Sequence, residues 1–236
     1  MLFTVRGGRC LRTGVSTARR KREVPDLFRF ERELWACGVR WVAGCDEVGV
    51  GPLAGPVVAA AVVMSPTVDV AGVRDSKTLT ARQREELARR IEAAAVSIGV
   101  GVVDATEIDR MNVLRATLEA MRRAVNALHV KPDFLLVDAR TVPGVAIPQR
   151  AIVDGDALSY SIAAASIVAK VRRDAMMRQW HEQYPQYGFD RNMGYGTREH
   201  LQALARFGPC PLHRRSFAPV RQLGLFPSGG NGGGPG

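Results

Sequence analysis

Cysteine and long apolar stretches are both scarce in this chain of 236 residues. Its four cysteines, Cys10, Cys37, Cys45 and Cys210, are widely spaced and form no C-x-x-C pair. This spacing excludes a disulfide framework and argues against a zinc site. The longest apolar run, residues 57–64, has the length of a strand and falls short of the roughly 18 residues that cross a bilayer. We therefore expect a protein of the reducing cytoplasm without a membrane span.

The first 22 residues contain no acidic side chain but seven basic ones, so they carry most of the net charge of +10. A basic arm can attract a polyanion without reading its sequence. A solvated leader and a transit-like peptide are the other interpretations of this composition. We expect residues 1–24 to form a disordered leader and the Gly/Pro-rich residues 225–236 to form a disordered tail.

Hydrophobic periodicity between these ends predicts one α/β domain over residues 25–224. Apolar runs predict strands over residues 41–47, 57–64, 96–103, 134–137 and 149–153. Amphipathic spacing predicts helices over residues 26–37, 80–95 and 114–128. Residues 158–182, rich in Ala and Ser at first, also look helical. Two capping boxes mark helix starts, Thr80 with Gln83 and Asp104 with Glu107, the second for a short helix. The pattern favours a mixed sheet flanked by helices. A helical C-terminal part should span about 180–224, with its last helix starting near Thr197.

Four acidic residues stand beside apolar segments: Asp46, Glu47, Asp138 and Asp156. Carboxylates at strand ends in an α/β sheet point into the crevice where ligands usually bind. Because neighbouring carboxylates repel each other, a divalent cation such as Mg²⁺, which takes oxygen ligands, would remove the conflict. Two such ions can activate water and stabilise the leaving oxygen in phosphodiester cleavage. On spacing alone, surface positions, helix caps and ion pairs remain the alternative.

Asp46 and Glu47 pose a geometric problem, because successive residues of a strand point to opposite faces. They can share a site only if the strand ends or bulges there, which the following glycines at 49 and 51 permit. The stretch 49–55 is not a dinucleotide fingerprint, since it lacks the third glycine and Pro52 is badly placed to open a helix. Its glycines can instead bring bare backbone against a nucleic-acid ribose.

Six short motifs that follow one another between residues 26 and 224 resemble those of ribonuclease HII. Each is weak alone, and their common order makes the resemblance specific. They are GCDEVG at 44–49 with GPLAGP at 51–56, DSK at 75–77 with Leu79, VDA at 137–139, GDA at 155–157 with SIAAASI at 161–167 and AKVRRD at 169–174, GYGT at 194–197 with His200, and HRRSF at 213–217. Ribonuclease HIII is less similar, because it has a longer N-terminal substrate-binding domain and a Glu at the position of Asp156.

The resemblance implies a ribonuclease H-like fold with a mixed five-stranded sheet and a helical C-terminal portion. It implies hydrolysis of the RNA strand of RNA–DNA hybrids and cleavage 5′ of single ribonucleotides embedded in duplex DNA. Mn²⁺ or Mg²⁺ would be the cofactor, and the products would carry 5′-phosphates. By motif position, the catalytic residues would be Asp46, Glu47, Asp138 and Asp156, the first three as metal ligands. A monomer without an obligate protein partner is expected.

The same resemblance assigns contacts with the nucleic acid. The backbone of Gly49, Val50 and Gly51 would touch the 2′-hydroxyl, which distinguishes RNA from DNA. Tyr195 would pack on the nucleotide at the RNA–DNA junction. Lys77 would meet a phosphate, and a solvated loop lysine is the alternative for this residue.

Two positions depart from the family pattern, which has Arg at position 50 and usually Lys at position 193. This chain has Val50 and Met193, and both changes remove a cation from the expected substrate face. Each lost contact would cost on the order of 1.5–3 kcal/mol, or roughly a tenfold to hundredfold loss. We expect an active enzyme with weakened junction recognition. The alternative is a hybrid-binding protein without catalysis, against which the four intact acids speak.

Overall fold

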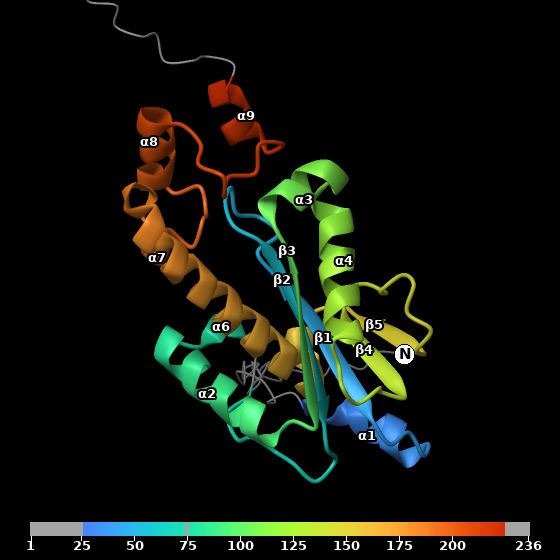
Figure 1. Cartoon of the computed structure of the whole chain (residues 1–236). Helices are drawn as coiled ribbons and strands as arrows, with labels where there is room; N and C mark the ends of the chain where they lie inside the picture. The colour runs from blue at the N-terminus through green and yellow to red at the C-terminus, as the bar shows by residue number, and fades with distance from the viewer. Residues whose placement is uncertain (1–25, 74–75, 225–236) are drawn as a thin grey trace, which may run out of the picture.

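A mixed five-stranded sheet forms the centre of the molecule (Figure 1), as the sequence predicts. The computed structural model describes residues 26–73 and 76–224; the expected leader and tail, together with Arg74 and Asp75, lie outside them. The strand order is β3-β2-β1-β4-β5. β2 pairs antiparallel with β1 and β3, whereas β4 pairs parallel with β1 and β5. The strands are β1 (Val42–Val48), β2 (Val57–Met64), β3 (Ser97–Val103), β4 (Phe134–Asp138) and β5 (Gln149–Ile152).

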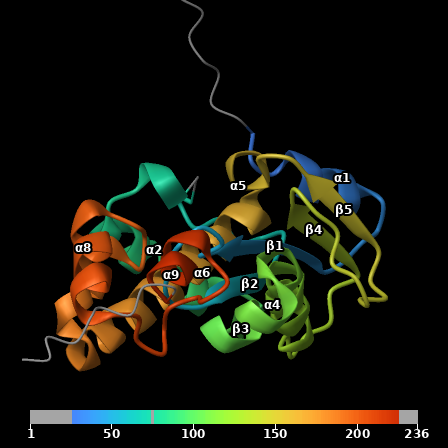
Figure 2. The same cartoon turned by 90° about the horizontal axis from the view of Figure 1, so that it is seen from above.

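Helices cover both faces of this sheet, which Figure 2 shows from above. All eight residues of β2 are buried, as its uninterrupted apolar run predicts. Alternate β2 residues enter different cores: Ala59 and Ala61 pack toward α4, and Ala60 and Val62 toward α6 and α2. The helices of this part are α1 (Arg29–Ala36), α2 (Ala81–Ala94), α3 (Ala105–Met111), α4 (Val113–Asn126), α5 (Gly155–Leu158) and α6 (Tyr160–Gln183), with a 3-10 turn, η1, at Ser76–Thr78.

Gly44 allows α6 to lie directly on β1. A Cβ at this position would fall far inside van der Waals distance of the Ser161 carbonyl group and the Ile162 nitrogen. On the opposite face, Gly99 and Gly101 of β3 leave the same room for the backbone of α4. Only residues without a side chain permit such close approach of helix and strand backbones. The close approach of α6 to β1 therefore depends on Gly44.

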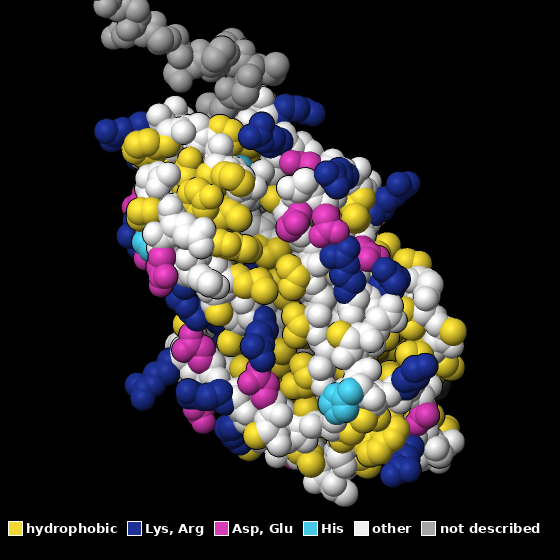
Figure 3. Space-filling view, in the orientation of Figure 1, with side chains coloured by type: hydrophobic (Ala, Val, Ile, Leu, Met, Phe, Trp, Pro, Cys, Tyr) yellow, Lys and Arg dark blue, Asp and Glu magenta, His cyan; other side chains and the backbone are white. Residues whose placement is uncertain are grey.

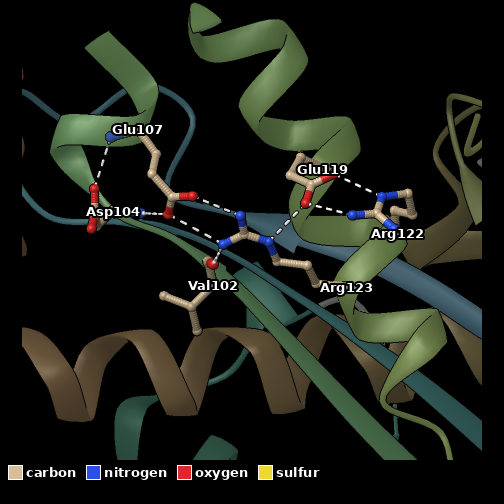
Figure 4. Close-up of polar contacts among 6 residues, drawn as sticks. All are labelled: Val102, Asp104, Glu107, Glu119, Arg122 and Arg123. Carbon is tan, nitrogen blue, oxygen red and sulfur yellow. Dashed lines mark hydrogen bonds and ion pairs between the residues drawn. The ribbon is translucent and has the colours of Figure 1, made fainter. Parts of the chain in front are cut away.

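Arg123 of α4 joins α3 and the edge strand β3 to its own helix (Figure 4). Its guanidinium donates to Glu107 at 2.6 Å, to the Val102 carbonyl at 2.6 Å and to Glu119 at 2.8 Å. Arg122 and Arg123 together hold the pKa of Glu119 at about 2. Because β3 lies at the edge of the sheet, the bond to the Val102 carbonyl also ties this edge strand to α4.

Charged side chains of both signs are spread over the face of the molecule seen in Figure 3. Basic side chains lie beside acidic ones along the rim, and a hydrophobic band crosses the middle. This distribution agrees with a chain whose excess positive charge lies mostly in residues 1–22. In the described part of the chain, no helix is long and apolar enough to cross a membrane. Within the same residues, Cys37, Cys45 and Cys210 are free thiols.

The C-terminal part packs around its own core, beside the end of α6. Thr197 caps α8 as predicted, but the prediction that this helix is the last one is wrong, because α9 follows it. Val220 of α9 is buried in the C-terminal core. A helix of seven residues makes about two turns and gives little periodicity to detect. The elements here are η2 (Pro185–Tyr187), α7 (Phe189–Asn192), α8 (Arg198–Phe207) and α9 (Ala218–Gly224).

Candidate active site

Three of the predicted catalytic acids meet where β1 and β4 lie side by side. Asp46 and Glu47 belong to β1, and Asp138 is the last residue of β4. The parallel register places Cys45 beside Val137, so the next residues along the two strands are neighbours. Each of the three carboxylates offers an oxygen, and these oxygens lie within 4.8 Å of one another.

The arrangement of Asp46 and Glu47 differs from the expected strand end or bulge. β1 continues to Val48 in unbroken register with β2, and Glu47 pairs with Ala59. The pairing of β1 with β4 stops earlier, at Cys45 and Val137. On its β4 side, β1 is thus no longer in the ladder at Asp46 and Glu47, and it is here that the three carboxylates meet. The Asp46 carboxylate in turn accepts the Glu47 N–H at 2.7 Å.

Burial and mutual repulsion act together on these carboxylates. Burial raises the pKa of Asp46 well above its usual range, and the negative charge of Glu47 adds to the effect. Burial and then Asp138 raise the pKa of Glu47 to about 7. Burial likewise raises the pKa of Asp138. Within the described residues, Glu47 Oε2 is buried without a hydrogen-bond partner. Lys77 and Arg140 offset these shifts only in part. A group of close oxygen donors whose repulsion is not fully balanced fits a hard divalent cation.

The fourth predicted acid, Asp156, lies next to this group in α5. Its carboxylate forms an ion pair with Lys77 at 3.0 Å, whereas Asp46, Glu47 and Asp138 form the cluster of mutually close oxygens. Gly155, the residue before Asp156, donates its N–H to the Asp138 carboxylate at 2.7 Å. The first turn of α5 therefore holds the Asp138 carboxylate through Gly155 and also carries Asp156. The Lys77 side chain is 78% exposed and stands at the mouth of the site.

All four acids line one pocket of about 260 Å³ together with Lys77 and Tyr195. Four further residues line the pocket without a role predicted from the sequence: Ser76, Ser166 and Lys170, which belong to the motifs, and Arg84, which lies outside them. Ser166 hydrogen-bonds Asp46 and lies 2.9 Å from the Ser76 hydroxyl. Lys170 follows Ser166 by one helical turn, and this i,i+4 spacing within a helix beside Asp156 is the signal that could have identified the pair.

The predicted nucleic-acid contacts lie at one rim of the pocket. Gly49 has a φ of 89°, and Val50 is 37% exposed. Tyr195 is 45% exposed, and a Cβ at Gly51 would lie 3.9 Å from its ring. Met193, by contrast, is half-buried and packs against the C-terminal core. The structure thus brings the glycine stretch and Tyr195 together, but it turns position 193 inward.

The pKa of Glu47 predicts how stability depends on pH and on metal. Its folded value lies above the usual 4.5, so its contribution to stability is complete below pH 4.5 and is lost as the pH rises through about 7. We expect the melting temperature in EDTA to fall from pH 5 to pH 8 and Mn²⁺ to restore it at pH 8. Thermal unfolding at both pH values measures this. Asp138→Asn should flatten both effects, and an EDTA sample that gains stability over this range would contradict the interpretation.

Comparison with known proteins identifies the family. A family model described as ribonuclease HII matches residues 43–220. Ribonuclease HII of Geobacillus kaustophilus (strain HTA426) is 57% identical over 198 residues, which are 84% of this chain and 76% of that protein. Ribonuclease HII of Myxococcus xanthus (strain DK1622) is 54% identical over 204 residues, or 86% and 70% of the two chains.

A solved structure supports the fold independently. The ribonuclease H2 from Pyrococcus horikoshii OT3 superposes with a TM-score of 0.66 at 30% identity, over 78% of this chain and 96% of that one. Its similarity confirms the ribonuclease H-like fold, and the curated relatives make the chain a ribonuclease H-type hydrolase. On these grounds, the chain belongs to the ribonuclease HII family.

Proposed function

We propose that this enzyme hydrolyses the RNA strand of RNA–DNA hybrids and cuts 5′ of single ribonucleotides embedded in duplex DNA. Mn²⁺ or Mg²⁺ would bind at the carboxylate cluster. The observation that carries the proposal is the meeting of Asp46, Glu47 and Asp138 within 4.8 Å, with one oxygen of Glu47 buried and unpartnered. Cleavage at embedded ribonucleotides would make this the first step of ribonucleotide excision.

The side chains of the cluster and its neighbours would have separate roles in the reaction. A bound divalent ion supplies an activated water and charge stabilisation at the phosphate. Asp46, Glu47 and Asp138 would hold it, and Asp138 is kept in place by the Gly155 N–H. Asp156 binds the Lys77 ammonium at 3.0 Å, and this cation would meet the scissile phosphate.

Recognition of the ribonucleotide is assigned to the rim of the pocket. The backbone of Gly49, Val50 and Gly51 would contact the 2′-hydroxyl, because this stretch carries little side-chain bulk in front of its peptide groups. Tyr195 would pack on the nucleotide at the junction, and its 45% exposure supports this role.

Cleavage of a labelled DNA duplex with one ribonucleotide tests the proposal, with Mg²⁺ and with Mn²⁺. A cut 5′ of the ribonucleotide is the expected result. Cleavage of long RNA–DNA hybrids alone would mean that junction recognition is lost. Failure to cut either substrate, with binding intact, would identify a catalytically inactive hybrid-binding protein instead.

Restoring a cation at position 50 should strengthen the enzyme. Val50 is 37% exposed, so Val50→Arg can place a guanidinium at the substrate face without displacing the core. We expect kcat/KM on the single-ribonucleotide duplex to rise about tenfold, as one charged phosphate contact is gained. Steady-state kinetics at low salt measures this, with Val50→Gln as the uncharged control.

The corresponding change at position 193 should help less. Because Met193 packs against the C-terminal core, Met193→Lys removes apolar contacts while it adds the charge. If neither Val50→Arg nor Met193→Lys changes cleavage, the weakening attributed to these two positions is wrong.

A further inference from the structure

Two arginines are completely buried behind the glycine stretch that follows β1. Arg173 comes from α6 and Arg214 from the loop before α9, and both side chains are 0% exposed. Arg214 donates to the carbonyls of Gly49 at 2.6 Å, Val50 at 2.9 Å and Gly55 at 2.9 Å.

Arg173 binds the same loop from the other side. Its guanidinium donates to the carbonyls of Pro56 at 3.0 Å, Ala54 at 3.2 Å and Met193 at 3.0 Å. The Gly194 carbonyl accepts the N–H groups of Leu53 and Ala54, so the segment that carries Tyr195 is fixed to this loop as well. The two arginines thus define the position of both segments that form the rim of the pocket.

Buried guanidiniums that bind only neutral carbonyls are unusual. Among the ion pairs within the described residues, none involves Arg173 or Arg214. Burial, followed by repulsion from Arg173, lowers the pKa of Arg214 to about 9, which still leaves it charged at neutral pH. The negative charges of Asp174, for Arg173, and of Asp109, for Arg214, offset the effect of burial only in part. A buried charge that forms no ion pair is costly. This cost indicates that residues 49–56 must keep the conformation that the two arginines impose.

The conformation imposed by Arg214 exposes two peptide N–H groups. The structure contains no cis peptide bond within the described residues, and in a trans peptide the N–H points opposite to the C=O. Because the carbonyls of Gly49 and Val50 both point at Arg214, the N–H groups of Val50 and Gly51 point away from it. Neither N–H donates to a backbone carbonyl among the hydrogen bonds of the described loops. Both residues are exposed, so the two donors face the solvent at the rim.

We propose that Arg214, supported by Arg173, is a positioning residue for ribonucleotide recognition. Its guanidinium fixes the two peptide planes so that the N–H groups of Val50 and Gly51 donate to the 2′-hydroxyl oxygen. The positive charge also polarises both peptide groups and makes their N–H bonds better donors. This inference rests on the proposed function and explains how recognition operates with an uncharged side chain at Val50.

Binding in an Asp138→Asn background, with Mg²⁺ present, tests this proposal without cleavage. The dissociation constant is measured for a DNA duplex with one ribonucleotide and for the same duplex with a 2′-fluoro or 2′-deoxy nucleotide in its place. Arg214→Lys keeps the charge but cannot bind three carbonyls in one planar fork. We expect the preference for the ribonucleotide to fall about tenfold or more, while binding of all-DNA duplex changes less than about twofold. Arg215→Lys, at the adjacent exposed arginine, is the matched control and should change neither quantity.

Each outcome decides a different point. A folded Arg214→Lys protein that keeps its preference would overturn the assignment of Arg214 but not the proposed function. A protein with intact Arg214 and no preference at all would overturn both. If Arg214→Lys does not fold, amide hydrogen exchange on the Asp138→Asn protein decides the matter. The amides of Val50 and Gly51 must then become protected by the ribonucleotide duplex and not by all-DNA duplex, and equal protection by both would refute the proposal.

Discussion

Asp138→Asn is expected to lower kcat on both RNA–DNA hybrids and single-ribonucleotide duplexes on the order of 10³-fold or more. Asp138 supplies one of the three oxygens that lie within 4.8 Å of one another. Asparagine has nearly the same shape and can still accept the Gly155 N–H that the carboxylate accepts at 2.7 Å. The substitution therefore removes the negative charge and little else, and substrate binding should remain within a few-fold of the original value.

Asp154 provides a matched control for this substitution. It lies one residue before Gly155 and outside the cluster, with a φ of 55° that asparagine tolerates well. Asp154→Asn also removes one negative charge close to the carboxylate cluster, and it should leave kcat within about threefold of the original value. Single-turnover cleavage with saturating Mn²⁺ compares the two. If Asp138→Asn keeps more than a tenth of the original rate, the assignment of Asp138 as a metal ligand is wrong.

Gly44→Ala should lower the free energy of unfolding by at least about 3 kcal/mol, or prevent folding. The added Cβ would overlap the Ser161 carbonyl group and the Ile162 nitrogen, which belong to the backbone of α6 and cannot rotate away. Relief requires α6 to move off β1, and α6 carries Ser166, which hydrogen-bonds Asp46. Urea unfolding measures the stability loss, and the same sample should bind Mn²⁺ more weakly.

Gly51→Ala tests whether the effect comes from the clash rather than from the loss of a glycine. A Cβ at Gly51 would make one ordinary contact, 3.9 Å from the Tyr195 ring. We expect a stability change of less than about 1 kcal/mol for this variant. Similar losses for Gly44→Ala and Gly51→Ala would show that the approach of α6 to β1 is not the reason for Gly44.

Local patterns predicted most of the secondary structure. Thr80 with Gln83 and Asp104 with Glu107 form the capping boxes expected from their spacing, because a capping box depends on four consecutive residues alone. The short helix α5 was not predicted, because the expected helix began at residue 158. In the structure Ser159 ends α5 and caps α6, which starts at Tyr160.

Long-range packing accounts for what the sequence could not predict. The convergence of Glu47 with Asp46 depends on where β4 stops pairing with β1, which no local pattern encodes. Arg173 and Arg214 look like ordinary surface cations in the sequence, because arginine is rarely fully buried. Their role requires knowledge of which carbonyls from distant segments turn toward them.

The parallel pairing of β1 with β4 also determines when the site can form. Val42 pairs with Phe134, so a long intervening chain must be ordered before the two strands can meet. Contacts of such separation form slowly, since the entropy of closing the loop is lost before the contact is gained. During synthesis, Asp46 and Glu47 leave the ribosome well before Asp138. Until Asp138 has emerged, the three-carboxylate cluster cannot form. In refolding experiments, Mn²⁺ binding should therefore follow helix formation, which makes the metal site a reporter of completed folding.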